Sequence, residues 1–121
     1  MDTKVYSGIV TRGQGAATRL GFPTVNIVLV DDSVNGVYAA KIRADGGHYM
    51  GAVFADQKRK LLEAHLLDFS GDLYGKEITI EVYEKIRDSQ YFKDEQQLSA
   101  AIAEDVRKTR VILEAWKPGH S

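Results

Sequence analysis

The sequence predicts a small antiparallel β-barrel with one C-terminal helix packed against it. Six short segments in the first two-thirds of the 121 residues have strand character, and a helical pattern begins near residue 94. Gly, Asp, Asn and Ser occupy the gaps between the segments, as is typical of tight connections. Closing the strands into a barrel would remove exposed strand edges, and the helix could cover an open end or a seam.

The six expected strands differ in how clearly they alternate. The segment 77–87 is the most regular, with Ile78, Ile80 and Val82 on one face and polar residues between them. The full set of expected strands is 4–11, 24–30, 36–44, 48–55, 62–69 and 77–87.

The helix is predicted by apolar residues that recur at steps of three and four, among them Leu98, Ile102 and Leu113. Asp94 followed by Gln97 resembles a capping box at its start, and Pro118-Gly119 is expected to close the segment.

Composition indicates a single domain over residues 1–121 and excludes several classes of protein. Sixteen Lys and Arg balance seventeen Asp and Glu, and this net charge of −1 argues against an electrostatic nucleic-acid binder. The absence of cysteine excludes disulfides and thiolate metal sites. No signal peptide and no run of about 20 apolar residues is recognisable. We therefore expect a soluble, cytoplasmic globular domain. We also expect a monomer without a nucleic-acid or membrane partner.

A glycine-bearing loop precedes the second expected strand. Gly13, Gly15 and Gly21 permit tight turns and a close approach of backbone N–H groups to an anion. The spacing fits neither the P-loop nor the dinucleotide fingerprint. On composition alone the signal for phosphate binding is weak, and a simple turn is favoured over a phosphate-binding loop.

The stretch LGFPTVNI (20–27) follows this loop. Pro23 fixes the direction from which the strand begins, and alternation then places Thr24 and Asn26 on one face, with Val25 and Ile27 toward the core. Two neutral oxygen ligands beside a glycine loop would suit Mg²⁺. The alternative is an ordinary strand, since Thr favours strands and Asn often marks strand ends.

A second candidate site lies in LLEAHLLDF (61–69). Alternation predicts that Glu63 and His65 share a face with Leu67 and Phe69. A partly desolvated Glu63 could accept a proton, or it could be a solvated residue at the barrel rim. His65 could be a hydrogen-bonding neighbour, since no second histidine stands at metal-ligand spacing.

Two further groups of residues follow the fifth strand. Asp68, Asp72 and Tyr74 are first interpreted as turn residues. Arg87 and Phe92 lie between the last strand and the helix, where the arginine could clamp a flat ring or brace the helix.

Taken together, these motifs resemble the riboflavin kinase (flavokinase) family. LGFPTVNI matches the family's Gly-hydrophobic-Pro-Thr-Ala-Asn motif, with Val25 in place of Ala. EAHLLDFSGDLYG (63–75) matches its Glu-x-His segment and the Asp-hydrophobic-Tyr-Gly that follows. IRDSQYF (86–92) and the helical stretch 96–110 resemble the segments that close the domain. The resemblance covers nearly the whole chain, with several motifs in the family's order.

The resemblance implies a six-stranded antiparallel Greek-key barrel with a C-terminal helix. It also implies transfer of the γ-phosphoryl group of ATP to the ribityl 5′-hydroxyl of riboflavin, with Mg²⁺, to give FMN and ADP. Glu63 would be the catalytic base, Thr24 and Asn26 would engage Mg²⁺, and Arg87 and Phe92 would lie on the flavin side. The implied nucleotide-binding residues are Gly13, Gly15, Thr18, Arg19, Gly21, Thr24, Asn26, His65 and Tyr74.

The chain departs from the family pattern in two places. Ala17 and Thr18 stand where bacterial members usually carry Gly and Arg, and the stretch 51–65 is shorter and lacks the usual Asn-x-Gly and Pro-Thr elements. The usual FAD synthetase domain is absent from these residues, so we expect either a free-standing kinase or one half of a longer protein. A non-catalytic flavin- or nucleotide-binding barrel is the alternative. An oligonucleotide-binding barrel is disfavoured by the neutral charge.

Overall fold

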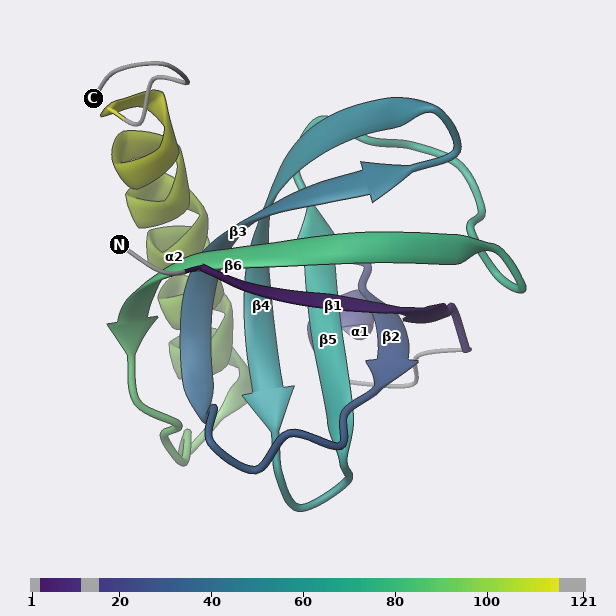
Figure 1. Cartoon of the computed structure of the whole chain (residues 1–121). Helices are drawn as coiled ribbons and strands as arrows, with labels where there is room; N and C mark the ends of the chain where they lie inside the picture. The colour runs from purple at the N-terminus through teal and green to yellow at the C-terminus, as the bar shows by residue number, and fades with distance from the viewer. Residues whose placement is uncertain (1–2, 12–15, 116–121) are drawn as a thin grey trace.

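The computed structural model describes residues 3–11 and 16–115, and it forms one barrel with a long helix beside it (Figure 1). The elements are, in chain order, β1 (Lys4–Ile9), α1 (Ala16–Arg19), β2 (Val25–Val28), β3 (Gly36–Ala44), β4 (Gly47–Asp56), β5 (Leu61–Leu66), β6 (Glu77–Arg87) and α2 (Glu95–Ala115). No helix in these two ranges is long and apolar enough to cross a lipid bilayer.

The six strands form one antiparallel sheet in the order β1-β6-β3-β4-β5-β2. The first and last strands of this order meet just beyond the end of β1, where the backbone N–H of Thr11 donates to the carbonyl of Asn26 at 2.8 Å. This contact brings the two edges together, so the sheet is a nearly closed barrel. The predicted fold class, a six-stranded antiparallel barrel with a C-terminal helix, is confirmed.

The barrel interior is filled by the inward-facing residues of all six strands. Ile27, Val53 and Ile80 are fully buried there, and Val25 packs against the same cluster. The expectation that Val25 and Ile27 face the core is therefore confirmed. Register explains this, because side chains two apart along a strand share a face.

The fifth strand is shorter than predicted, and this overturns one expectation. The N–H of Leu67 still donates to the carbonyl of Met50 at 2.8 Å, but Asp68 then adopts a left-handed backbone with φ of 58°. The alternation is broken at that point. Phe69 consequently does not share a face with Glu63; it packs against the barrel core, with its ring centroid 5.1 Å from that of Tyr49.

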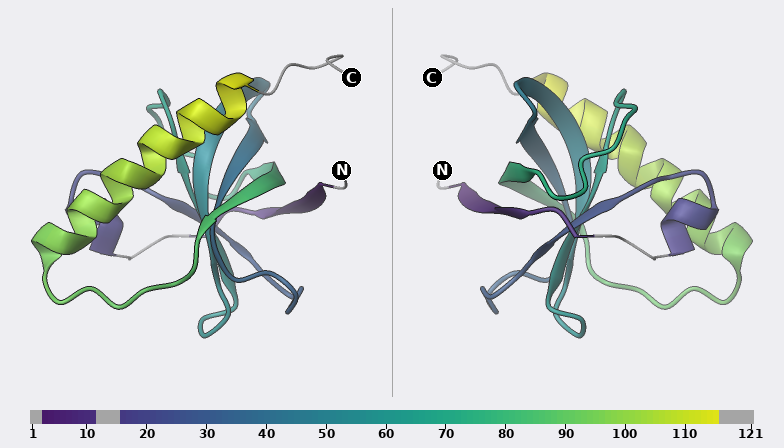
Figure 2. Two further views of the ribbon diagram at one scale, coloured as in Figure 1. Left: turned by 90° about the vertical axis from the view of Figure 1, so that its left-hand side faces the viewer. Right: turned by 90° about the vertical axis from the view of Figure 1, so that its right-hand side faces the viewer.

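The helix α2 lies along the outer wall formed by β3 and β4 (Figures 1 and 2). Its predicted start is confirmed, since Asp94 Oδ1 accepts the N–H of Gln97 at 2.9 Å. Gln97 Oε1 accepts the N–H of Lys93, one residue earlier than in the regular capping box. Pro118-Gly119, expected to close the helix, lies outside the described residues.

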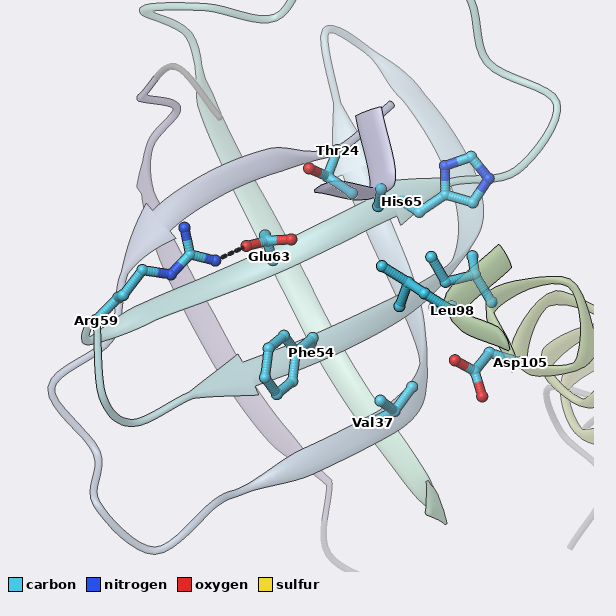
Figure 3. A pocket seen from close by; sticks show the side chains of 11 residues that line it. Thr24, Val37, Phe54, Arg59, Glu63, His65, Leu98 and Asp105 are labelled. Carbon is cyan, nitrogen blue, oxygen red and sulfur yellow. Dashed lines mark hydrogen bonds and ion pairs between the residues drawn. The ribbon is translucent and has the colours of Figure 1, made fainter. Parts of the chain in front are cut away.

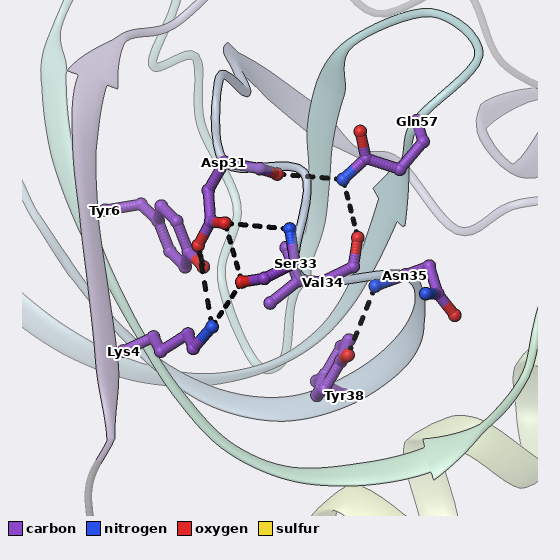
Figure 4. A network of polar contacts seen from close by, with 8 residues as sticks. All are labelled: Lys4, Tyr6, Asp31, Ser33, Val34, Asn35, Tyr38 and Gln57. Atoms are coloured by element: carbon purple, nitrogen blue, oxygen red, sulfur yellow. Dashed lines mark hydrogen bonds and ion pairs between the residues drawn. The ribbon is translucent and has the colours of Figure 1, made fainter.

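A side-chain network links β1 to the segment that follows β2 (Figure 4). Asp31 accepts hydrogen bonds from the Tyr6 hydroxyl at 2.7 Å and from the N–H and hydroxyl of Ser33 at 2.8 and 2.6 Å. Gln57 Nε2 donates to the carbonyls of Asp31 and Val34 at 2.8 and 2.6 Å. The bonds from Ser33 and Tyr6 hold the pKa of Asp31 well below its usual range. Burial and the Asp31 carboxylate raise the pKa of Tyr6.

Replacing Tyr6 with Phe is expected to lower the urea midpoint of unfolding at pH 7, because Asp31 loses one donor. A lowered carboxyl pKa stabilises the fold above the ordinary Asp pKa and ceases to do so as pH falls through the lowered value. The difference in urea midpoint between wild type and Tyr6→Phe should therefore become smaller in strong acid. Tyr49→Phe is the control, since no hydrogen bond to its hydroxyl is found among the described residues. Equal midpoints for wild type and Tyr6→Phe at pH 7 would contradict this role.

Candidate functional site

A cavity of about 250 Å³ lies on the outer face of the barrel, between the sheet and the two helices (Figure 3). β3, β4 and β5 provide one wall, and the first turns of α2 provide the other. Its lining residues are Ala17, Thr24, Val37, Ala52, Phe54, Arg59, Glu63, His65, Leu98, Ile102 and Asp105.

The pairing of β2 with β5 brings the predicted polar residues together. Asn26 stands directly opposite Glu63 in the antiparallel register, so their Cβ atoms are neighbours on one face. Thr24 lies on the same face, two residues before Asn26, and lines the cavity together with Glu63. Asn26 is 2% exposed and does not itself line the cavity. The three residues predicted from two distant motifs therefore meet at one place.

Thr24 and Asn26 each carry a buried oxygen without a hydrogen-bond partner. Thr24 Oγ1 and Asn26 Oδ1 are both fully shielded, and neither is satisfied within the described part of the chain. Buried polar atoms nearly always have a hydrogen-bond partner, so two neighbouring oxygens without one call for an explanation. Neutral oxygen ligands of this kind fit Mg²⁺, which keeps waters and substrate phosphates in the rest of its shell. No group of three His, Asp or Glu residues that could hold a metal is found in the ranges described.

Glu63 is buried and paired, so the rim interpretation is wrong. Its side chain is 8% exposed, and its Oε2 accepts a hydrogen bond from Arg59 Nη2 (Figure 3). A buried carboxylate needs such a partner because desolvation of an unpaired charge is costly. Oε1 of Glu63 has no hydrogen-bond donor among the described residues, and this leaves one oxygen for a ligand.

Arg59 was not predicted as a site residue. It lies on the hairpin between β4 and β5, where its Nε–H donates a hydrogen bond to Asp56 Oδ2 at 2.7 Å. That hydrogen bond raises the pKa of Arg59. Burial would raise the pKa of Asp56, but the hydrogen bonds from Arg59 outweigh it and the net shift is downward. The available signal in the sequence was the basic run after β4, four residues before Glu63.

His65 packs on the proline corner that opens β2. Its Nδ1 lies 2.8 Å from the carbonyl of Pro23, and since a carbonyl can only accept, Nδ1 carries the proton. Its ring also meets Phe22 edge to face, with centroids 5.7 Å apart. His65 lines the cavity and helps to hold the segment that carries Thr24. Its predicted contact with a nucleotide is not tested.

Arg87 braces the helix. Its Nε and Nη2 donate to the two oxygens of Asp105, both at 2.8 Å, and its guanidinium lies 5.3 Å from the centre of the Phe92 ring. Asp105 is buried and lines the cavity, whereas Arg87 and Phe92 do not. The bracing interpretation therefore fits this geometry, and the flavin-side role of Arg87 and Phe92 stays a prediction.

The first part of the glycine loop lies outside the described residues. Gly13 and Gly15 belong to the part not described, and so does the side chain of Arg19. Gly21 has a φ of 92°, the left-handed conformation that favours glycine. Thr18 is exposed, and its Oγ1 accepts the N–H of Thr24 at 3.4 Å. The short helix α1 in this loop was not predicted, because one turn gives no periodic signal.

Tyr74 does not line the cavity. Its N–H donates to Asp72 Oδ1 at 2.9 Å, which confirms the expected turn. The next residue, Gly75, donates its N–H to the carbonyl of Val10 at 3.0 Å. Tyr74 therefore stands near the end of β1, and its predicted role toward the nucleotide remains a prediction.

The apolar wall of the cavity was also missed by the sequence analysis. Val37, Phe54, Leu98 and Ile102 face one another across the gap between the sheet and α2. The signal was present, because outward positions of β3 and β4 are apolar where a solvated strand would be polar.

Comparison with known proteins gives one consistent result over nearly the whole chain. The family model described as flavokinase, riboflavin kinase, matches residues 3–113. A bifunctional riboflavin kinase/FMN adenylyltransferase of Buchnera aphidicola is 39% identical over 111 residues, which cover 83% of this chain and 36% of the relative. The chain thus spans little more than a third of the length of such curated relatives.

Two solved structures share the fold. A riboflavin kinase from Trypanosoma brucei superposes with a TM-score of 0.69 at 28% identity, covering 94% of this chain and 82% of that one. A protein of Streptococcus pneumoniae described as a macrolide-efflux protein gives a TM-score of 0.74 at 26% identity, with 88% of this chain and 36% of that chain covered.

Removing Arg87 should loosen α2 from the barrel. Arg87→Met leaves the carboxylate of Asp105 buried without its partner, and we expect the free energy of unfolding in urea to fall by about 3 kcal/mol. Arg107→Met removes an exposed pair with Glu104 on the same helix and should change stability little. Equal stabilities of the two variants would show that the Arg87 pair does not hold the helix.

Proposed function

This chain belongs to the riboflavin kinase (flavokinase) family, and we propose that it transfers the γ-phosphoryl group of ATP to the ribityl 5′-hydroxyl of riboflavin. The observation that carries the proposal is the meeting of Thr24, Asn26 and Glu63 on one face of the β2–β5 pair. The matched relatives also carry an FMN adenylyltransferase activity, but the alignment reaches only 36% of the Buchnera relative, and we do not extend that second activity to this chain.

Glu63 would act as the proton acceptor. A carboxylate is a far weaker base than an alkoxide, so it cannot deprotonate an alcohol in advance. Glu63 would therefore orient the 5′-hydroxyl through Oε1 and take its proton as the new P–O bond forms. The bond from the γ-phosphorus to the bridging oxygen breaks in the same step, and ADP leaves. Most of the catalytic effect in phosphoryl transfer comes from positioning the reactants and neutralising charge.

Thr24 Oγ1 and Asn26 Oδ1 would hold Mg²⁺, since both are buried oxygens without another partner among the described residues. The bound ion would neutralise charge on the nucleotide phosphates. The protein's own part would be to hold these two side chains on one face of the sheet. The bond from Thr24 N–H to Thr18 and the packing of His65 on Pro23 hold the Thr24 segment. The pairing of β2 with β5 holds Asn26.

The apolar wall gives the flavin ring a place to bind. Phe54 from β4 and Leu98 and Ile102 from α2 present hydrocarbon to the cavity, as flat aromatic ligands require. Arg87, at the end of β6, and Phe92, in the connection to α2, are proposed to contact the flavin at the edge of the same site. We further propose that the protein works as a cytoplasmic monomer, in keeping with its near-neutral charge and lack of cysteine.

The alternative, a barrel that binds flavin or nucleotide without catalysis, is less well supported. It would leave a buried acid beside two unpaired oxygens without a purpose. The purified protein, supplied with riboflavin, ATP and Mg²⁺, should produce FMN. Quenching of flavin fluorescence with no FMN formed would favour the alternative instead.

Glu63→Gln should lower kcat for FMN formation by about 10²- to 10⁴-fold, because the amide cannot accept the hydroxyl proton. Dissociation constants for riboflavin and nucleotide should change little, as the shape of the side chain is kept. Glu77→Gln, an exposed glutamate on β6, is the control. A kcat for Glu63→Gln close to that of the wild type would remove Glu63 from the mechanism.

Thr24→Val should separate stability from metal binding. The variant loses a buried hydroxyl that has no partner in the described part of the chain, so its free energy of unfolding should stay unchanged or rise. Loss of a ligand should weaken the binding of Mg²⁺ with ADP by at least about tenfold, as titration calorimetry would measure. Thr109→Val is a matched control, because its buried hydroxyl in α2 also has no partner within residues 3–11 and 16–115 but does not line the cavity. Equal metal binding by the two variants would rule out Thr24 as a ligand.

A further inference from the structure

Arg59 places a positive charge directly beside the proposed proton acceptor, and the proposed reaction assigns it no task. Its Nη2 donates to Glu63 Oε2, and its Nε donates to Asp56 Oδ2 at 2.7 Å. Asp56 Oδ1 in turn accepts the backbone N–H groups of Lys58 and Arg59 at 3.0 and 3.1 Å. The guanidinium is thus anchored to its own hairpin at one edge and reaches the cavity with the other.

The guanidinium has donors to spare. It carries five N–H groups in a planar fork, and Nη1 makes no hydrogen bond to the described residues. Its side chain is 46% exposed, so the free edge is open to a ligand, whereas Glu63 beneath it is buried. Arg59 and His65 are the two basic residues among the described lining of the cavity, and Nδ1 of His65 is engaged with Pro23. Arg59 is therefore the lining side chain best placed to meet an anion.

The chemistry of the proposed reaction brings the phosphoryl group to this place. An acceptor hydroxyl bonded to Glu63 lies about 2.7 Å from the carboxylate, and the phosphorus it attacks lies about 3–3.5 Å from that hydroxyl oxygen. The phosphoryl group must therefore come within a few ångströms of a cation paired with the same carboxylate. Asp56 and Glu63 would otherwise present two negative charges to an incoming polyphosphate.

We propose that Arg59 is a catalytic residue that binds the γ-phosphoryl group of the nucleotide while remaining paired with Glu63. A guanidinium fork matches both carboxylate and phosphate geometry, so one side chain can bridge the base and the group being transferred. The inference rests on the proposed function. It also gives the β4–β5 hairpin, which departs from the family pattern, a part in the reaction.

The sharpest test compares ATP with ADP, because only ATP carries the γ-phosphoryl group. The measurement uses the Glu63→Gln background, in which a neutral side chain at position 63 no longer needs Arg59 as a partner. Asp56 loses the Nε donor in Arg59→Gln but keeps the backbone N–H groups of residues 58 and 59 on its Oδ1. Dissociation constants of the magnesium complexes of ATP and ADP are measured by titration calorimetry without riboflavin. Lys58→Gln in the same background removes an equal charge from the same hairpin and is the control.

Arg59→Gln should raise the dissociation constant of ATP by about tenfold or more and leave that of ADP nearly unchanged. This is the effect expected for one lost charge-assisted hydrogen bond to phosphate. Lys58→Gln should leave the ratio of the two constants unaltered. In the otherwise wild-type chain, Arg59→Gln should lower kcat for FMN formation by about 10²- to 10³-fold. Arg59→Lys keeps the positive charge but loses the guanidinium fork, so its kcat should lie between those of the wild type and Arg59→Gln.

Two outcomes for Arg59→Gln would overturn the proposal: an equal loss of affinity for ATP and ADP, or no change in affinity for either nucleotide. Thermal unfolding of each variant identifies a folding defect, which would weaken both nucleotides together. If the wild-type chain forms no FMN at all, the proposed function itself fails. If it forms FMN while Arg59→Gln behaves like Lys58→Gln, the role of Arg59 alone fails.

Discussion

The antiparallel register between β2 and β5 is the constraint on which the site depends. It sets Asn26 against Glu63 and Val25 against Ala64, so polar residues line the outer face and apolar residues fill the barrel. A slip of one residue would turn every side chain to the opposite face. Glu63 would then enter a core of Ile, Val and Leu, and Ile27 would lose its burial. The hydrophobic core therefore enforces the register that assembles the polar residues.

Helix α2 completes the cavity because it covers the outer wall of the barrel. The pair between Arg87 and Asp105 fixes the helix to the last strand, and the first turns of the helix then face Phe54 and Val37 across the gap. The result is a site with two kinds of wall. Unpaired oxygens and a paired acid lie on the sheet side, and hydrocarbon lies between sheet and helix, so that phosphate chemistry and a flat ring can be accommodated side by side.

Much of this arrangement could be predicted from the sequence, because it depends on short-range regularities. Alternation placed Thr24 beside Asn26 and Glu63 beside His65, and the order of the motifs indicated the family. The end of β5 was misjudged, since the left-handed turn at Asp68 carries no periodic signal, and with it the position of Phe69. The partner of Glu63 was missed for another reason. Arg59 reaches it through the geometry of a hairpin, which the residue types in the basic run do not reveal. Whether Gly13 and Gly15 bind phosphate remains a prediction, since both lie outside the described residues.

The central claim is that one metal ion, one acid and one hydroxyl meet on the outer face of the β2–β5 pair. A crystal structure with Mg²⁺, ADP and riboflavin bound would test it most directly. We expect a metal ion against the oxygens of Thr24 and Asn26, and the ribityl 5′-hydroxyl within hydrogen-bonding distance of Glu63. A metal held by other residues, or a ribityl chain that ends away from Glu63, would contradict it.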